Sequence, residues 1–366
     1  MNFIIKKINF LQPVQKLNHI ISINHEKPII NNILLIIKEN NVFLISTNLE
    51  IEFITKITCI KIYQNGKAVI PGKKLLHIIH SFPNNSEIQV SINNNHIRIF
   101  YKNIYFILNI FNAKHFPIFK KEKETINFHI SHQKFKNIIY NTHFCIANQD
   151  IRNYLNGIYI KIKKNKIYAV ATDGYRMAIS KIKIPTINNI PTIIIPKKTI
   201  LELIKLLDNT DKVLHIIIGK KTIKFYINQY IISSKLIDNE FPNYKNLLIK
   251  KFHTIIQINR DLLYQALNRA SILVHKKFQG IKLYLNNGQC TISTNNENND
   301  QVREKFSINY YHTPIELTLN INYILDVIKM IKNDTIKISL SKYKSSIYIE
   351  NNQEAHSLYI IMPLIL

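Results

Sequence analysis

Histidine pairs are the first residues in this sequence that could do chemistry. His77/His80 and His129/His132 have the i, i+3 spacing with which a helix can present two metal ligands. Neither pair has a cysteine or a carboxylate nearby as a third ligand. We therefore expect ordinary polar or core histidines and no metal or other cofactor.

Acidic residues give a second set of candidates. Three acidic pairs could hold a divalent ion for nuclease chemistry: Glu50/Glu52, Asp208/Asp211 and Glu297/Asp300. None of these pairs recurs in the internal repeat described below, so solvated turns or strand faces are the expected role. A divalent-metal nuclease is nevertheless kept as the alternative from the enzyme class.

Asp173, in the motif ATDGYR, would be the natural catalytic residue if the protein were an enzyme. The repeat places Asn48 and Asn295 at its equivalent positions. An amide cannot replace a catalytic carboxylate, but both side chains can close a turn. We therefore predict that Asp173 is a turn residue at the end of a strand.

Composition excludes several classes of protein. Only 7 of the 366 residues are glycine, and their spacing allows neither a GxGxxG nor a GxxxxGK[ST] phosphate loop. Three isolated cysteines, Cys59, Cys145 and Cys290, predict no disulfide framework and no zinc site, as expected in a reducing cytoplasm. No signal peptide and no apolar run of about 18 residues is present, so we expect a soluble cytoplasmic protein with no membrane partner.

The charge is strongly positive. Lys and Arg number 49 against 23 Asp and Glu, a formal net charge of +26. Such an excess favours a polyanionic partner such as nucleic acid. Because Ile, Asn and Lys dominate the whole chain, part of this excess fits drift toward A/T-rich codons. A basic monomeric scaffold that binds nucleic acid along its outside is therefore a second alternative.

The chain repeats itself three times, at intervals of 125 and 122 residues. The repeated β-hairpins are ILLIIKENNVFLISTN, GIYIKIKKNKIYAVATD and GIKLYLNNGQCTISTN, which end at Asn48, Asp173 and Asn295. An amphipathic helix follows each hairpin, beginning near Ile70, Ile195 and Leu319. Each copy also opens with a helix and closes with strands. The opening helices are expected over 11–21, 135–145 and 262–273, and the closing strands over 101–111, 225–236 and 346–349.

These intervals predict an α+β protein with three domains, 1–125, 126–253 and 254–366. The linkers are expected at Lys120–Thr125 and Leu248–His253. The apolar tail LYIIMPLIL, Leu358–Leu366, is unusual for a chain end. From the residues alone it either closes the last sheet as a strand or lines a docking groove.

Several motifs in order resemble the bacterial DNA polymerase III beta subunit, the β sliding clamp family. They are NQDIRNYLNG from Asn148, ATDGYRMA from Ala171, IPKK from Ile195, SKLIDNEFPNY from Ser234 and YIIMPL from Tyr359. The resemblance covers the whole chain. It implies three repeated clamp domains with antiparallel sheets outside and helices inside, which form a ring as a head-to-tail homodimer.

The resemblance implies that the protein is not an enzyme but a processivity factor that encircles duplex DNA and tethers the replicative polymerase. Twelve inward helices at about 9 Å spacing would leave a lumen of roughly 25 Å. The implied DNA-binding residues are Asn24, Lys73, Gln149, Asn153, Tyr154, Lys197, Lys198 and Lys277. Asn24 and Asn153 depart from the residues usual in the family.

The resemblance also implies a groove for short apolar peptides. Its implied partners are the DNA polymerase III alpha subunit, the clamp loader, repair polymerases, ligase and mismatch-repair proteins. The implied groove residues are Leu155, Thr172, Gly174, Tyr175, Arg176, Met177, Pro242, Leu247, Asn320, Tyr323, Ser346, Ile360, Met362, Pro363 and Leu364. The implied dimer interface consists of Lys74, Phe106, Leu108, Ile272 and Leu273.

Overall fold

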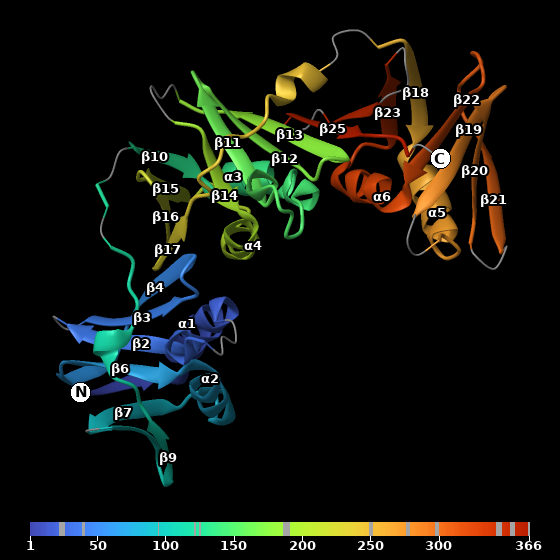
Figure 1. Cartoon of the computed structure of the whole chain (residues 1–366). Coiled ribbons are helices and arrows are strands. Elements are labelled where there is room, and N and C mark those ends of the chain that lie inside the picture. The colour runs from blue at the N-terminus through green and yellow to red at the C-terminus, as the bar shows by residue number, and fades with distance from the viewer. Residues whose placement is uncertain are drawn as a thin grey trace. The chain divides into compact units, whose positions relative to one another are not determined.

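The structure is a computed structural model of the 366-residue chain (Figure 1). It describes residues 1–21, 26–38, 41–93, 95–120, 122–123, 126–185, 191–248, 252–275, 279–296, 300–341, 346–351 and 356–364. None of the helices within these ranges is both long enough and apolar enough to cross a bilayer.

The chain forms two compact units. Unit 1 consists of Met1–Ser131 and Lys212–Leu236, and unit 2 consists of His132–Asp211 and Ile237–Leu366. The helices of unit 1 are α1 (Lys7–Ile20) and α2 (Gly72–Ser81). Its strands are β1 (Asn2–Lys6), β2 (Asn32–Lys38), β3 (Asn41–Thr47), β4 (Ile51–Ile57), β5 (Lys61–Gln64), β6 (Gly66–Pro71), β7 (Glu87–Asn93), β8 (His96–Tyr101), β9 (Ile104–Asn109), β10 (Ile126–Ser131), β15 (Val213–Ile218), β16 (Thr222–Ile227) and β17 (Tyr230–Lys235).

Unit 2 contains the other four helices, α3 (His132–Tyr140), α4 (Lys197–Leu206), α5 (Arg260–Ser271) and α6 (Ile321–Met330). Its strands are β11 (Gly157–Lys163), β12 (Lys166–Thr172), β13 (Arg176–Lys183), β14 (Ile193–Pro196), β18 (Thr254–Asn259), β19 (Gly280–Asn286), β20 (Gln289–Asn295), β21 (Gln301–Ser307), β22 (Ile315–Asn320), β23 (Thr335–Leu340), β24 (Ile347–Asn351) and β25 (His356–Ile361).

The described strands form four antiparallel sheets. Unit 1 holds a sheet of order β5-β1-β7-β8-β9 and one of order β10-β15-β16-β17-β4-β3-β2-β6. Unit 2 holds the orders β14-β11-β12-β13-β25-β24-β23-β18 and β21-β20-β19-β22. The helices pack in pairs, α1 with α2, α3 with α4 and α5 with α6, and each pair also contacts sheet strands.

The three repeated hairpins predicted from the sequence are confirmed as β2-β3, β11-β12 and β19-β20. The three following helices are confirmed as α2, α4 and α6. Their apolar residues at helical spacing are buried, for example Leu75 and Ile79 in α2. Burial of this stripe, at about 25 cal/mol per Å² of apolar surface, is what holds such short helices in place.

The opening helices differ in their bounds from the prediction. The second was expected to run from 135 to 145, but α3 ends at Tyr140, and a separate 3-10 turn covers His143–Cys145. The hydroxyl of Thr142 donates to the carbonyl oxygens of Ile138 and Ile139. The Thr142 hydroxyl therefore satisfies carbonyl oxygens in the last turn of the helix, and the helix ends there.

Two of the three closing strands were also predicted too long, whereas β24 extends beyond the expected range 346–349. The run expected over 225–236 is a hairpin of β16 and β17, and its turn contains Asn228 at φ 53°. The run expected over 101–111 contains only β9, because Lys102 turns the chain at φ 50°. The two-residue turns here, 102–103 and 228–229, contain no glycine or proline to mark the break, so the residue pattern did not reveal them.

Two strand pairs join neighbouring copies of the repeat. In unit 1, β4 pairs with β17, and Phe53 lies opposite Ile232. In unit 2, β13 pairs with β25, and Ala178 lies opposite Tyr359 (Figure 1). The hairpin alignment makes Phe53 and Ala178 equivalent, since both follow the repeated turn by the same number of residues. The two joins therefore have the same register.

Candidate partner-binding and DNA-binding surfaces

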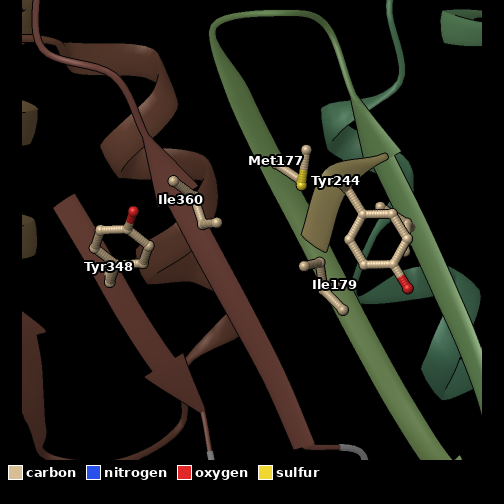
Figure 2. Close-up of a cluster of buried hydrophobic side chains, with 6 residues drawn as sticks. Met177, Ile179, Tyr244, Tyr348 and Ile360 are labelled. Carbon is tan, nitrogen blue, oxygen red and sulfur yellow. The ribbon is translucent and has the colours of Figure 1, made fainter. Parts of the chain in front are cut away.

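The join between β13 and β25 carries an apolar cluster on one face of its sheet. Met177 and Ile179 come from β13, and Ile360 comes from β25 (Figure 2). Val170 of β12, Tyr348 of β24 and Tyr244 of the short 3-10 helix Tyr244–Leu247 complete the cluster. Residues i and i+2 of a strand share a face, so the side chains of Met177 and Ile179 lie on the same side of the sheet. We call this surface the seam surface.

A tight turn borders the seam surface between β12 and β13. Asp173 Oδ1 accepts hydrogen bonds from the backbone N–H groups of Tyr175 and Arg176, both at 3.0 Å. The Thr172 hydroxyl donates to the Arg176 carbonyl oxygen at 2.7 Å, and Gly174 has φ 95°. The prediction that Asp173 is a turn residue is confirmed. The first copy builds the same turn with Asn48, whose Oδ1 accepts two backbone N–H groups.

Arg176 joins this turn to the third copy of the repeat. Its Nη1 lies 2.7 Å from Asp326 Oδ2 in α6, its Nε lies 3.0 Å from Asp173 Oδ2, and its Nη2 donates to the Phe144 carbonyl at 2.7 Å. The guanidinium also lies 4.4 Å from the ring centroid of Tyr323. With only 12% of its side chain exposed, Arg176 holds the surface in shape more than it offers charge to a partner.

The structure confirms the strand, one of the two alternatives that the sequence left open for the apolar tail. Its first part is a strand, β25, in the sheet of unit 2. Its last described part leaves the sheet edge, where the N–H of Met362 donates to the Tyr175 carbonyl at 2.9 Å and the N–H of Leu364 donates to the Thr318 carbonyl at 2.7 Å. The tail is therefore fixed between the β12-β13 turn and β22.

The residues assigned to the groove differ in exposure. Leu155, Thr172, Met177, Ser346 and Ile360 are buried. Tyr175, Met362 and Leu247 keep 63%, 40% and 39% of their surface exposed. Half-buried or exposed positions complete the set: Gly174, Arg176, Pro242, Asn320, Tyr323, Pro363 and Leu364. All fifteen belong to unit 2.

Backbone and side-chain contacts tie these groups to one another. The Tyr348 hydroxyl donates to the Leu247 carbonyl at 3.0 Å, and this bond holds the segment Tyr244–Leu247 against β24. Asn320 caps α6 by accepting from the backbone N–H of Asn322, at 3.0 Å. The exposed Tyr175 and Met362 are in turn linked by a backbone hydrogen bond.

The DNA-binding residues assigned in unit 2 lie on two neighbouring segments. Gln149 and Asn153 are exposed on the loop that precedes β11, and Tyr154 is half-buried beside Phe241. Reciprocal hydrogen bonds between Asp150 and Asn156, of 2.9 and 2.8 Å, brace this loop. Hydrogen bonds from Arg152 lower the pKa of Asp150 to about 2.

The lysines at the start of α4 differ from each other. Lys198 is exposed, whereas Lys197 is half-buried and its Nζ lies 3.5 and 3.4 Å from the carbonyl oxygens of Ile146 and Ala147. Burial, together with nearby Arg176, lowers the pKa of Lys197. In unit 1, Lys73 is exposed on α2. Asn24 and Lys277 lie outside the described residues.

The residues assigned to the dimer interface lie near sheet edges. Phe106 and Leu108 are half-buried on β9, the edge strand of its sheet, and Phe106 packs against Phe82 at 5.8 Å between ring centroids. Lys74 is exposed on α2. In unit 2, Ile272 is exposed and Leu273 half-buried at the end of α5.

Sequence reasoning missed three residues that shape the seam surface: Asp326, Phe144 and Tyr348. Asp326 lies in α6, and its partner Arg176 is 150 positions away in the sequence. No local pattern contains such a contact. In the described ranges, no cluster of three or more His, Cys, Asp or Glu residues is placed to hold a metal ion.

Comparison with known proteins identifies the family over the full chain. Family models of the DNA polymerase III beta subunit match residues 1–120 (N-terminal domain), 129–243 (central domain) and 245–365 (C-terminal domain). The beta sliding clamp of Buchnera aphidicola subsp. Rhopalosiphum padi is 37% identical, and that of Buchnera aphidicola subsp. Acyrthosiphon pisum is 34% identical, each with complete coverage of both chains. The crystal structure of the DNA polymerase III subunit beta from Pseudomonas aeruginosa matches with a TM-score of 0.95 at 29% identity, and both chains are covered completely.

The three domain matches agree with the threefold repeat of hairpins and helices, so the chain has three clamp domains. The family acts in DNA replication as a non-catalytic processivity subunit, and this function replaces the nuclease alternative. The chain belongs to the beta sliding clamp family of bacterial DNA polymerase III.

Proposed function

We propose that this chain forms a head-to-tail homodimeric ring that encircles duplex DNA, with helices lining the hole, and tethers the DNA polymerase III alpha subunit. The single observation that carries the ring is that β4-β17 and β13-β25 join successive copies of the repeat in one register. Among the described strands, a third join of this kind has no partner. It would link the third copy of one subunit to the first copy of another.

The free edges are the right ones for this join. In the third copy of the repeat, β21 is the equivalent of β4 and β13. In the first copy, β9 is the equivalent of β17 and β25. Both β21 and β9 are edge strands of their sheets in the described structure. By the same register, Phe106 of one subunit would lie opposite Arg303 of the partner subunit, as Ile232 lies opposite Phe53. A heterologous contact of this type closes into a ring only if its rotation fits.

Weak contacts with phosphates suit a clamp that slides. Duplex DNA carries about one charge per 1.7 Å of axis, so exposed Lys73 and Lys198 would attract it without reading bases. Gln149, Asn153, Tyr154 and Lys197 are proposed as further contacts or supports, with Asn24 and Lys277. Retention would come from closure of the ring, and mobility from exchangeable phosphate contacts. We place this activity in the cytoplasm, where the free cysteines Cys59, Cys145 and Cys290 would stay reduced.

The decisive experiment compares circular and linear DNA. Wild-type protein is loaded on a nicked circular duplex, and its loss is followed before and after one restriction cut. We expect slow loss from the circle and rapid loss after cutting, together with a sedimentation mass twice the 43.0 kDa of the chain. Equal rates from both forms, with a mass of one chain, would favour the monomeric basic scaffold.

We further propose that the fifteen groove residues, which include Met177 and Ile360 of the seam surface, recruit the polymerase, the clamp loader, repair polymerases, ligase and mismatch-repair proteins through short apolar peptides. Met362→Ala together with Leu364→Ala should weaken binding of a polymerase-derived peptide by about 2 kcal/mol or more. Because both residues are remote in sequence from β9 and β21, the mass in solution should not change. Isothermal titration gives the affinity, and unchanged affinity would remove these two residues from the site.

A further inference from the structure

A corner of the large sheet in unit 2 brings basic side chains into opposed positions, including two lysines. Lys166 of β12 is the register partner of Lys183 of β13, and Lys181 of β13 is the register partner of His356 of β25. Lys181 and Lys183 are two positions apart on one strand, so the four side chains start from the same face of the sheet. Like charges in directly opposed positions destabilise a strand pair.

Glu350 of β24 is an acidic residue whose charge acts on this corner, and it acts on His356. In the described part of the chain, no carboxylate lies within ion-pair distance of Lys166, Lys181 or Lys183. Burial, and then the charge of Lys181, lower the pKa of His356. The corner thus holds Lys166 opposite Lys183 against their mutual repulsion.

The fold itself does not require these cations. The equivalent corner in unit 1, at the β4-β17 join, has Asn41 in place of Lys166, Lys56 in place of Lys181 and Gln229 in place of His356. Two neutral residues and one lysine therefore occupy these three positions at a join of the same register. The cationic corner is a particular property of the β13-β25 join.

The corner also has room for a ligand. A cavity of about 360 Å³ is lined by Lys166, Lys181, Lys183 and His356 together with Lys134 and Asn137 of α3. Ammonium groups converge on tetrahedral oxyanions, and an amide can donate a further hydrogen bond. We propose that this cavity binds a phosphate group, whose negative charge offsets the repulsion between the opposed lysines.

The test uses the full-length protein, inorganic phosphate and two matched variants. Lys181→Gln with Lys183→Gln removes two charges from the cavity at nearly constant side-chain length. Lys332→Gln with Lys337→Gln removes two exposed charges of unit 2, and Lys337 lies opposite the neutral Gln257. Thermal unfolding is followed in chloride and in phosphate at equal ionic strength, because phosphate also stabilises proteins by exclusion from their surface.

In chloride, the cavity variant should unfold at a higher temperature than the wild type, because the opposed charges are gone. At about a hundredfold excess over its dissociation constant, phosphate should raise the Tm of wild type and control by about 5 °C more than it raises that of the cavity variant. An equal phosphate response in all three proteins would overturn the proposal. A cavity variant that is less stable than the wild type in chloride would contradict the argument from repulsion.

A second arm separates the two sources of a phosphate group. Affinity for a short duplex is measured against salt concentration by fluorescence anisotropy. If the backbone of DNA supplies the phosphate, the cavity variant should lower the slope of log K against log salt by about 2. If the slope is unchanged while the phosphate response is lost, the ligand is a free phosphate or a small phosphorylated molecule.

Discussion

At the scale of single residues, Arg176 shows how one side chain can couple two copies of the repeat. It binds Asp173 on its own turn, Asp326 on α6 and the carbonyl of Phe144. A planar fork of five donors can satisfy these acceptors together, which a lysine cannot. Tyr323, one of the residues assigned to the groove, is held beneath the same guanidinium.

We predict a strong coupling between Arg176 and Asp326. Arg176→Met and Asp326→Asn should each lower the free energy of unfolding, because each leaves a partner short of its hydrogen bonds. The double variant should recover about 1–2 kcal/mol relative to the sum of the two. Urea unfolding followed by far-UV circular dichroism measures this cycle. Strict additivity would show that the contact contributes nothing of its own.

A second prediction concerns His143, which stacks on Tyr140 with 5.3 Å between ring centroids. Burial lowers the pKa of His143 below its value in the unfolded chain. The unfolded state then binds more protons as the pH falls through about 6.5, so stability should decrease from pH 7 to pH 5. His143→Gln should reduce this decrease, and the exposed His115→Gln should not. Denaturant midpoints at both pH values provide the comparison.

At the scale of elements, the end of α2 depends on a buried lysine. Lys7, the first residue of α1, donates from Nζ to the carbonyl oxygens of His80, at 3.0 Å, and Phe82. These carbonyls end α2, where the helix dipole favours a cation. Lys7, the charged first residue of α1, therefore satisfies carbonyl oxygens at the end of α2.

Lys7→Met should cost about 1–2 kcal/mol, because the carbonyls lose charge-assisted hydrogen bonds and stay buried. Lys6→Met is the matched control, since Lys6 is the neighbouring residue and is exposed. Thermal unfolding of both variants measures the difference. Equal Tm values for the two variants would mean that the hydrogen bonds of Lys7 only compensate for the free-energy cost of burying its ammonium group.

The edge strand β9 yields a prediction about assembly. It presents Ile104, Tyr105 and Ile107 to solvent and Phe106 and Leu108 half-buried. A long apolar edge is a template for pairing with another strand. Phe106→Glu with Leu108→Glu should give a monomer, whereas Tyr63→Glu, on the opposite edge strand β5 of the same sheet, should not. Sedimentation equilibrium distinguishes these results, and a dimeric double variant would contradict the proposed subunit contact.

At the scale of the whole molecule, successive copies of the repeat are joined by equivalent pairs of strands. The sheet that leaves the first copy is continued by β17 of the second, and the sheet that leaves the second is continued by β25 of the third. Backbone hydrogen bonds across such joins do not depend on side-chain identity. Thus the copies diverge in residue type, from Phe53 to Ala178, while their register is kept.

The sequence alone determined the local elements and their threefold order. Strand alternation and helical spacing depend on a few neighbouring residues, so the hairpins, the helices and the turn at Asp173 could be predicted. The tertiary structure decided which edges meet, that Arg176 reaches Asp326, and that Lys7 is buried at the end of α2. These contacts join residues 73 to 150 positions apart. Their free energy comes from groups that become neighbours only after the chain has folded, and no local pattern of residue types encodes them.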